Sequence, residues 1–232
     1  MSGIFKNLGV VLVTAFSFEA SAQAASTTVD LQSLDSGTYS SVNAGHISSE
    51  TSIYIQQDSA NVSRNFFVFD FNGLNMTNLV SAELYANNVW NLSPESHLAY
   101  SLYDVTTNIN DLRTSGTGQY SVFNDLGTGA RFANIELNNP GRYDNFVMTF
   151  NQSGIDAAKA ATGLFAFGGA LTSQTSGVAF MFGDNENPGA PFTYGLRLTF
   201  SESVTAVPEA DSYAMLLAGL GVVSLIIRRR NK

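Results

Sequence analysis

The chain has 232 residues, with 19 acidic against 11 basic side chains, a formal net charge of −8 and no cysteine. The absence of cysteine excludes disulfides, thiolate metal sites and a cysteine nucleophile. The acidic balance, without a basic stripe interleaved with aromatic residues, argues against nucleic acid or anionic lipid headgroups as partners.

The first 24 residues have the composition of a secretory leader. Lys6 supplies a positive charge, and an apolar run from Leu8 to Phe18 follows it. Ala22 and Ala24 then form a small-x-small site for signal peptidase. We therefore expect residues 1–24 to be a signal peptide and the rest of the chain to fold outside the cytoplasm.

Residues 25–206 are predicted to form one β-sandwich domain. Alternation of large apolar with small or polar residues indicates strands at 65–71, 98–105, 146–150, 178–182 and 194–200. Weaker patterns of the same kind cover 27–31, 52–56, 81–87, 132–137 and 164–167. Clusters of Asn, Gly, Ser and Pro, such as 138–141 and 183–189, separate these segments and favour turns.

Only one segment, Ser153 to Ala161, has a helical pattern, with Ser153 as the expected N-cap and Gly163 as the expected stop. Many short strands with one short helix, without heptads or regular strand–helix alternation, predict an all-β fold. The expected architecture is an antiparallel, jelly-roll-like sandwich, followed by a C-terminal hydrophobic helix.

Catalytic signatures are missing from this sequence. His46 and His97 are far apart in the chain, and neither accompanies a Gly-x-Ser-x-Gly elbow. Carboxylates such as Asp70 and Glu136 are scattered singly instead of forming the closely spaced pattern that glycoside hydrolysis needs. We therefore expect no catalytic residues and no enzymatic activity.

One loop is a candidate metal site. Asp184 and Glu186, with the asparagines that follow each of them, place hard oxygen ligands close together, which suits calcium. The alternative is a turn without metal, because Asn and Asp side chains also bond to their own backbone. No other cofactor is expected.

Aromatic residues supply the candidate glycan contact. Trp90, the only tryptophan, lies in an Asn-rich segment with Tyr85 close by in the sequence. Sugar rings stack their C–H faces on such side chains while neighbouring amides bind the hydroxyls. The alternative interpretation is that Trp90 packs over the end of the sandwich.

The C-terminal segment combines a polar motif, an apolar run and a basic end. The motif is Val207-Pro208-Glu209-Ala210, the expected transmembrane segment is 213–227, and the basic end at 228–232 contains Arg228, Arg229 and Arg230. The run of 14 residues from Ala214 to Ile227 gives about 21 Å of helix, short of a bilayer's hydrocarbon thickness of about 30 Å. Tyr213 and the arginines extend the span, and the arginines keep the basic end cytoplasmic.

This tripartite tail resembles the PEP-CTERM sorting signal of Gram-negative bacteria, with Ala210 standing where the family has a second proline. The resemblance implies transient anchoring in the inner membrane, processing at residues 207–232 by exosortase, and delivery to the cell surface or extracellular matrix. It also implies a biofilm or exopolysaccharide setting. The alternative is a plain membrane anchor that is never cleaved.

A second resemblance covers residues 64–105. The segments Arg64 to Phe71, Leu79 to Tyr85 and Ser101 to Val105 look like the corresponding run of DNRLRE-type jelly rolls, which occur on secreted carbohydrate-active and cell-surface proteins. We expect a non-enzymatic surface or matrix protein with a structural or glycan-interacting role. The alternative is a secreted hydrolase or lyase acting on the same polysaccharide.

Overall fold

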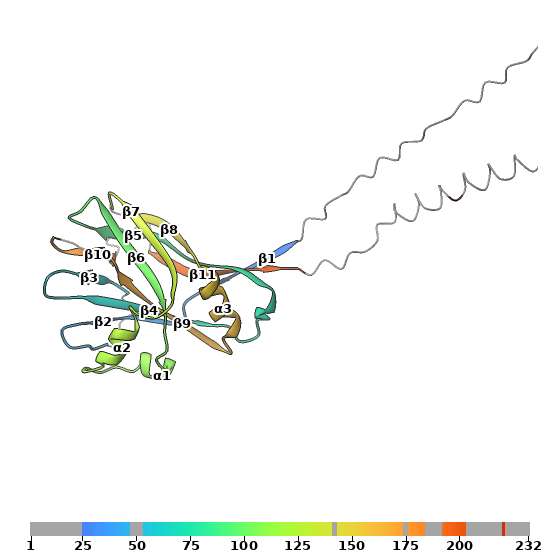
Figure 1. The fold of residues 1–232 in the computed structure, drawn as a ribbon, viewed down its shortest axis with the longest axis horizontal. Helices are drawn as coiled ribbons and strands as arrows, with labels where there is room; N and C mark the ends of the chain where they lie inside the picture. Colours follow the sequence, from blue (N-terminus) through green and yellow to red (C-terminus); the bar gives the residue numbers. More distant parts are fainter. Residues whose placement is uncertain are drawn as a thin grey trace, which may run out of the picture.

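The computed structural model describes residues 25–46, 53–140, 143–173, 176–183 and 192–202, together with Leu220. The strands of the described body form two antiparallel sheets packed face to face (Figure 1). The predicted antiparallel sandwich is therefore confirmed, and each of the ten predicted segments overlaps a strand.

The first sheet contains β1 (Ser26–Leu31), β3 (Ile55–Gln57), β5 (Leu79–Leu92), β8 (Asp144–Thr149), β10 (Ala179–Gly183) and β11 (Thr193–Ser201). The second contains β2 (Asp35–Ser40), β4 (Ser63–Asp70), β6 (His97–Asp104), β7 (Arg131–Asn138) and β9 (Leu164–Leu171). The sequence does not predict β2, because its small polar residues do not alternate with large apolar ones.

The strand order is that of a jelly roll. The strands β11 and β8 pair with overlapping parts of β5 and so occupy its two opposite edges, giving the order β1-β11-β5-β8. The second sheet has the order β4-β9-β6-β7, with β2 added beside β4. Most successive strands cross between the sheets as in two Greek keys, and the exceptions are β6 to β7 and β10 to β11, which stay within one sheet. The strand β10 pairs with the last residues of β5, and β3 pairs with β10 in turn.

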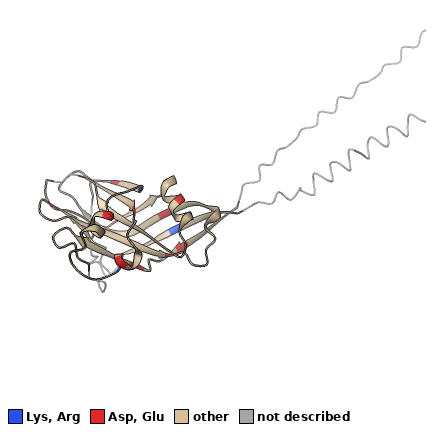
Figure 2. Cartoon of the chain, turned by 60° about the horizontal axis from the view of Figure 1, so that its bottom comes forward, with Lys and Arg blue, Asp and Glu red and all other residues tan. Residues whose placement is uncertain are grey.

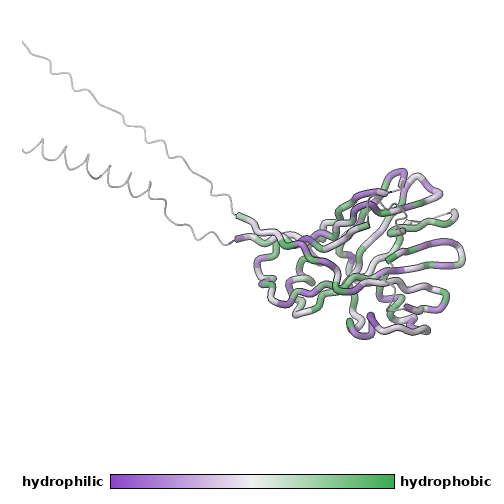
Figure 3. The backbone as a smooth tube through the Cα atoms, turned by 180° about the vertical axis from the view of Figure 1, so that it is seen from behind, coloured by the Kyte–Doolittle hydropathy of each residue, from purple (hydrophilic) through white to green (hydrophobic). Residues whose placement is uncertain are grey.

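Phenylalanine rings fill the space between the sheets. The rings of Phe69 and Phe167 are stacked with centroids 5.6 Å apart, and Phe67 lies 5.3 Å from Phe167. Apolar and polar residues alternate along most strands, as Figure 3 shows, and the apolar ones point into this core. Burial of these large aromatic surfaces is the main source of stability for the body.

A second apolar cluster lies on the outer side of the second sheet. The helices α1 (Ile109–Leu112) and α2 (Tyr120–Asp125) cover Phe66 and Val68 there, so β4 is buried on both faces. Arg64 attaches α2 to this strand, because its Nη1 donates to the carbonyls of Phe123 at 2.8 Å and Asn124 at 2.9 Å. These helices correct the prediction of a single helix.

The predicted helix is present with shifted bounds and a different cap. It is α3 (Gln152–Ala160), and its N-cap is Asn151, whose side-chain oxygen accepts from the backbone N–H of Gly154 at 3.1 Å. Ser153 lies inside the first turn, so the prediction that it caps the helix is wrong. The helix ends at Ala160, and Gly163 lies beyond it in a left-handed conformation at φ 88°.

The two ends of the described body leave it together. The backbone N–H of Glu202 donates to the carbonyl of Ala25 at 2.9 Å, and Figure 1 shows β1 and β11 projecting at that end. The predicted leader (residues 1–24) and, apart from Leu220, the sorting tail lie outside the described residues. Within the described part of the chain, no helix is long and apolar enough to cross a membrane.

Candidate functional site

A β-bulge decides which way Trp90 points. In the first half of β5, Leu84 and Ala86 face the core and Tyr85 faces outward. The register shifts between Ala86 and Val89, where Asn88 has a φ of 57°, a conformation that Asn tolerates better than most residues. Because of the extra residue, Val89 faces the core, and Trp90 lies on the same outer face of the sheet as Tyr85.

Trp90 belongs to an aromatic patch across three neighbouring strands. Its ring meets Phe180 of β10 edge to face with centroids 5.0 Å apart, and Phe180 lies 5.5 Å from the ring of Tyr54 beside β3. Leu92 lies opposite Phe180 in the register, and Val178 precedes Phe180 by two residues. We call these five residues the distal patch, because Figure 1 shows β3 and β10 at the end of the sandwich away from the projecting strands β1 and β11.

The distal patch is open to solvent at its aliphatic members. The exposed fractions are 44% for Leu92 and 47% for Val178, whereas Trp90 and Tyr54 are half-buried and Phe180 is buried. The indole N–H of Trp90 is covered and has no hydrogen-bond acceptor among the described residues. Trp90 therefore presents part of its ring while its polar edge is turned inward.

Ordered polar groups border the patch. Gln56 accepts from the hydroxyl of Tyr54 at 3.0 Å and donates to a carboxylate oxygen of Asp58 at 2.6 Å. Backbone N–H groups of Ala60 and Asn61 also bond to Asp58, and these hydrogen bonds, with that from Gln56, hold the pKa of its carboxyl below the usual value. An amide and an ionised carboxylate thus stand in fixed positions beside the aromatic rings.

A loop contact positions Val178 at the other border. Glu95 accepts from the hydroxyl of Ser176 at 2.6 Å and from its backbone N–H at 3.2 Å. These bonds hold the pKa of Glu95 below its usual value. They also tie the turn after β5, which follows Leu92, to the loop that carries Val178. The loop that carries Val178 therefore lies next to the turn that follows Leu92.

Tyr85 shares the outer face with Trp90 but has different neighbours. Its hydroxyl accepts from Gln32 Nε2 at 3.3 Å, and its ring lies beside Gly195, where an added Cβ would come within 2.4 Å of the hydroxyl oxygen. The guanidinium of Arg197 lies 5.3 Å from the ring centre and bonds to Asp30 at 2.9 Å. Tyr85 therefore borders a charged row instead of the distal patch.

The histidines and carboxylates weighed as catalytic candidates lie in separate places. His46 is buried against the rings of Tyr39 and Phe66, whereas His97 begins β6 near Glu95. Acidic residues are spread over several separate parts of the described chain, as the red segments of Figure 2 show. No group of three or more His, Asp or Glu residues in the described chain could hold a metal ion. The calcium candidates Asp184 and Glu186 lie outside the described residues, so that site stays a prediction.

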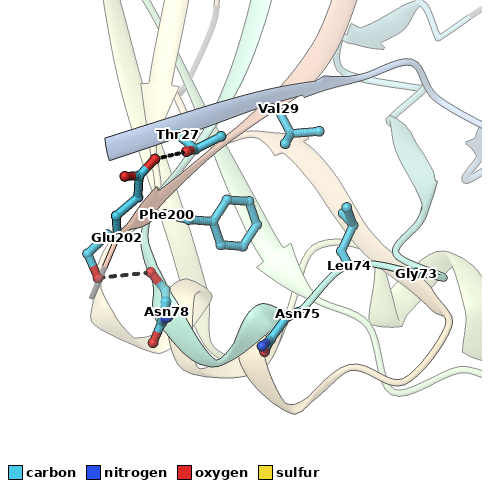
Figure 4. Close-up of a pocket in the computed structure, with 9 residues that line it drawn as sticks. Thr27, Val29, Gly73, Leu74, Asn75, Asn78, Phe200 and Glu202 are labelled. Atoms are coloured by element: carbon cyan, nitrogen blue, oxygen red, sulfur yellow. Dashed lines mark hydrogen bonds between the residues drawn. The ribbon is translucent and has the colours of Figure 1, made fainter. Parts of the chain in front are cut away.

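Two hollows lie away from the distal patch. A groove of about 430 Å³ opens at the end where the termini leave, with Val29, Leu74 and Phe200 as its apolar residues (Figure 4). The hydroxyl of Thr27 donates to Glu202 at 2.7 Å across its rim. A hollow of about 270 Å³ lies beside His46 and Gly116. Glu202 and His46 are the titratable residues among those lining these hollows.

The comparison with known protein families identifies the tail. Residues 206–230 match the PEP-CTERM protein-sorting motif. This match covers the four sorting residues from Val207 to Ala210 and the three arginines, which themselves lie outside the described residues. No curated protein matches the chain. The protein is thus an exported β-sandwich with a membrane-directed sorting tail. More particularly, the tail is a PEP-CTERM sorting motif, which marks the protein as an exosortase substrate.

The sequence could not have revealed the full patch. The sequence indicates Trp90, because it is the only tryptophan and lies in an Asn-rich segment. Tyr54 and Phe180 come from segments distant in the sequence, and each resembles any strand residue when viewed alone. Only the pairing of β10 with both β3 and β5 brings the three rings together. The predicted partner Tyr85 makes its contacts elsewhere on the same face.

Proposed function

We propose that this protein is a non-enzymatic component of the cell surface or extracellular matrix, and that its distal patch contacts exopolysaccharide. The sorting tail explains its delivery, and the distal patch supports the contact. The single observation that carries the proposal is the aromatic patch of Tyr54, Phe180 and Trp90, which lies at the end of the body away from the projecting strands β1 and β11.

The chemistry of the patch suits a sugar chain. Sugar rings present C–H faces that pack on aromatic and aliphatic surface, here the ring of Trp90 with Leu92 and Val178. Hydroxyl groups need fixed polar partners, and the amide of Gln56 and the carboxylate of Asp58 stand beside the rings. The six basic and sixteen acidic residues of 25–207 give a charge of −10, which disfavours polyanions at low salt. The preferred polymer is therefore neutral or cationic.

The test measures retention of the processed protein on immobilised exopolysaccharide from its host. Trp90→Ala and the double variant Leu92→Ser with Val178→Ser should each weaken retention at least about tenfold, because they remove the stacking and aliphatic surface. The matched control is Val147→Ser. Val147 is 49% exposed on the outer face of the same sheet, beside Tyr85 in the register, and it lies outside the patch. Equal retention of all variants would refute the glycan contact.

The same samples test the absence of catalysis. Polymer length and new reducing or unsaturated ends are measured after incubation with the wild-type protein. We expect no change. Turnover that persists through purification would instead establish the secreted hydrolase or lyase, and the non-enzymatic assignment would then be abandoned.

A further inference from the structure

The strand β1 is an open edge. Among the described strands it pairs only with β11, and the register runs without a break from Ser26 opposite Ser201 to Leu31 opposite Leu196. Edge strands of soluble proteins are usually protected by proline, a bulge, unpaired charge or very short length. The six residues of β1 have none of these features: the one charged side chain, Asp30, is paired with Arg197 at 2.9 Å.

The hydrogen-bonding groups on this edge can be assigned residue by residue. The bond from the N–H of Glu202 to the carbonyl of Ala25 makes these two residues a hydrogen-bonded pair. Because such pairs alternate along an antiparallel ladder, the backbone groups of residues 27, 29 and 31 also point toward β11. The N–H and C=O groups of Ser26, Thr28 and Asp30 therefore point away from the sheet, toward the open edge.

We propose that this edge pairs with β1 of a second copy of the chain. A two-fold axis beside Thr28 lets the two Thr28 residues exchange both backbone hydrogen bonds, while Ser26 of each copy lies opposite Asp30 of the other. Threonine pairs are favourable across strands, and no like charges face each other in this register. On the inner side, Val29 of each copy lies opposite Thr27 of the other, at the groove shown in Figure 4.

The position of the two chain ends indicates that the β1–β1 pair forms in the processed protein. Each β1 begins at Ser26, next to the point where leader and tail join the body, and runs inward. An antiparallel pair of β1 strands therefore points the terminal ends of the two copies in opposite directions. Copies released from the membrane by processing can take up this opposed orientation without constraint from their tails.

The test uses processed protein purified from the host and followed by sedimentation velocity over a range of concentrations. We expect a reversible dimer. Thr28→Pro should raise the dimer dissociation constant at least about tenfold, because it removes two interstrand bonds without removing one to β11. Thr28→Ala, which keeps the N–H, is the matched control and should remain dimeric. A wild-type monomer throughout, or a dimer unaffected by proline, would overturn the proposal.

A second variant gives an answer even if proline disturbs folding. The chain has no cysteine, so Thr28→Cys introduces one thiol per copy. In the proposed pairing the two Thr28 Cα atoms lie about 5.5 Å apart, within the range of a disulfide. Oxidation should link this variant into dimers much faster than Val147→Cys, an exposed control on the same sheet. Equal rates would contradict the two-fold register.

Discussion

The hydroxyl of Tyr100 donates to the side-chain oxygen of Asn65 at 2.8 Å in the middle of the sandwich. Both residues are fully buried, and the amide of Asn65 donates in turn to the carbonyl of Ile53 at 3.0 Å. Burial raises the pKa of the Tyr100 hydroxyl well above its ordinary value, so it remains a donor. This polar pair joins β6 to β4 across the intervening strand β9.

Removing the Tyr100 hydroxyl tests how much its hydrogen bond to Asn65 contributes to the free energy of unfolding. Tyr100→Phe keeps the ring but leaves the side-chain oxygen of Asn65 without its hydrogen bond, which should lower the free energy of unfolding by about 1–2 kcal/mol. Urea unfolding of the purified protein measures the difference. Tyr120→Phe is the control, since Tyr120 is 53% exposed and should tolerate the change. Equal stability of the two variants would contradict the account of a buried polar link.

Gly169 makes room for the same pair. A Cβ at this position would lie 1.8 Å from the hydroxyl oxygen of Tyr100 and 2.4 Å from the side-chain oxygen of Asn65. We expect Gly169→Ala to lower the unfolding free energy by about 2 kcal/mol or more, through overpacking and displacement of the buried pair. Gly177→Ala is the matched control, because its Cβ would meet Pro94 at an ordinary 3.5 Å. A harmless Gly169→Ala substitution would show that the core rearranges freely.

Asp125 should make stability depend on acid pH. Its carboxylate accepts from the N–H and hydroxyl of Thr107, both at 2.7 Å, and from those of Thr106, both at 2.9 Å. Burial alone would raise the pKa of Asp125, but these bonds outweigh it and hold the pKa below the ordinary value. The stabilisation is therefore complete above the unfolded-state pKa of about 3.9 and disappears as pH falls through the lower folded-state pKa.

The substitution Asp125→Asn checks this linkage. An amide accepts at one oxygen only, so the variant should lose about 2 kcal/mol at neutral pH and progressively less at pH values below about 4. Unfolding by urea is measured at several pH values for wild type and variant. Asp156→Asn serves as the control, because Asp156 is exposed and accepts from Gln152. A pH-independent difference between Asp125→Asn and wild type would refute the linkage.

Deleting Ala214 to Lys232 should release the protein from membranes. The deleted segment carries the apolar run and the arginines of the matched sorting motif. The described body contains no helix able to cross a bilayer, so we expect the truncated protein in the soluble periplasmic or secreted fraction. Fractionation of washed membranes provides the measurement. Truncated protein that still pellets would place the anchoring elsewhere in the chain.

The sequence predicts the strands well because their signal is local. Alternation along segments such as 194–200 identifies β11, and Leu196 and Leu198 face the core as that pattern indicates. Alternation of apolar and polar residues is weakest in the phenylalanine-rich β4. Its outer face is covered by α1 and α2, so apolar residues are buried on that face too. Those helices are only 4 and 6 residues long, too short for a helical period to show in the sequence.

The features that the sequence could not predict depend on contacts between distant segments. The bulge at Asn88 turns Trp90 to the outer face, and nothing in the local pattern of β5 indicates it. From the sequence, Asn65 is only a polar residue at the start of a predicted strand. Its buried hydrogen bonds depend on Tyr100 and Ile53, which are distant in the sequence. The sorting tail is the opposite case, because its three parts adjoin one another and are read directly from their order along the chain.

Delivery by the tail is the claim on which the rest depends, and the intact mass of the protein recovered from its native host tests it most directly. The full chain has a mass of 24.8 kDa. We predict that the recovered protein lacks residues 1–24 and the apolar tail, whereas Pro208→Ala with Glu209→Ala accumulates in the membrane with the tail attached. A wild-type mass that still includes Ala214 to Lys232, or the same processed mass in the double variant, would contradict sorting by exosortase.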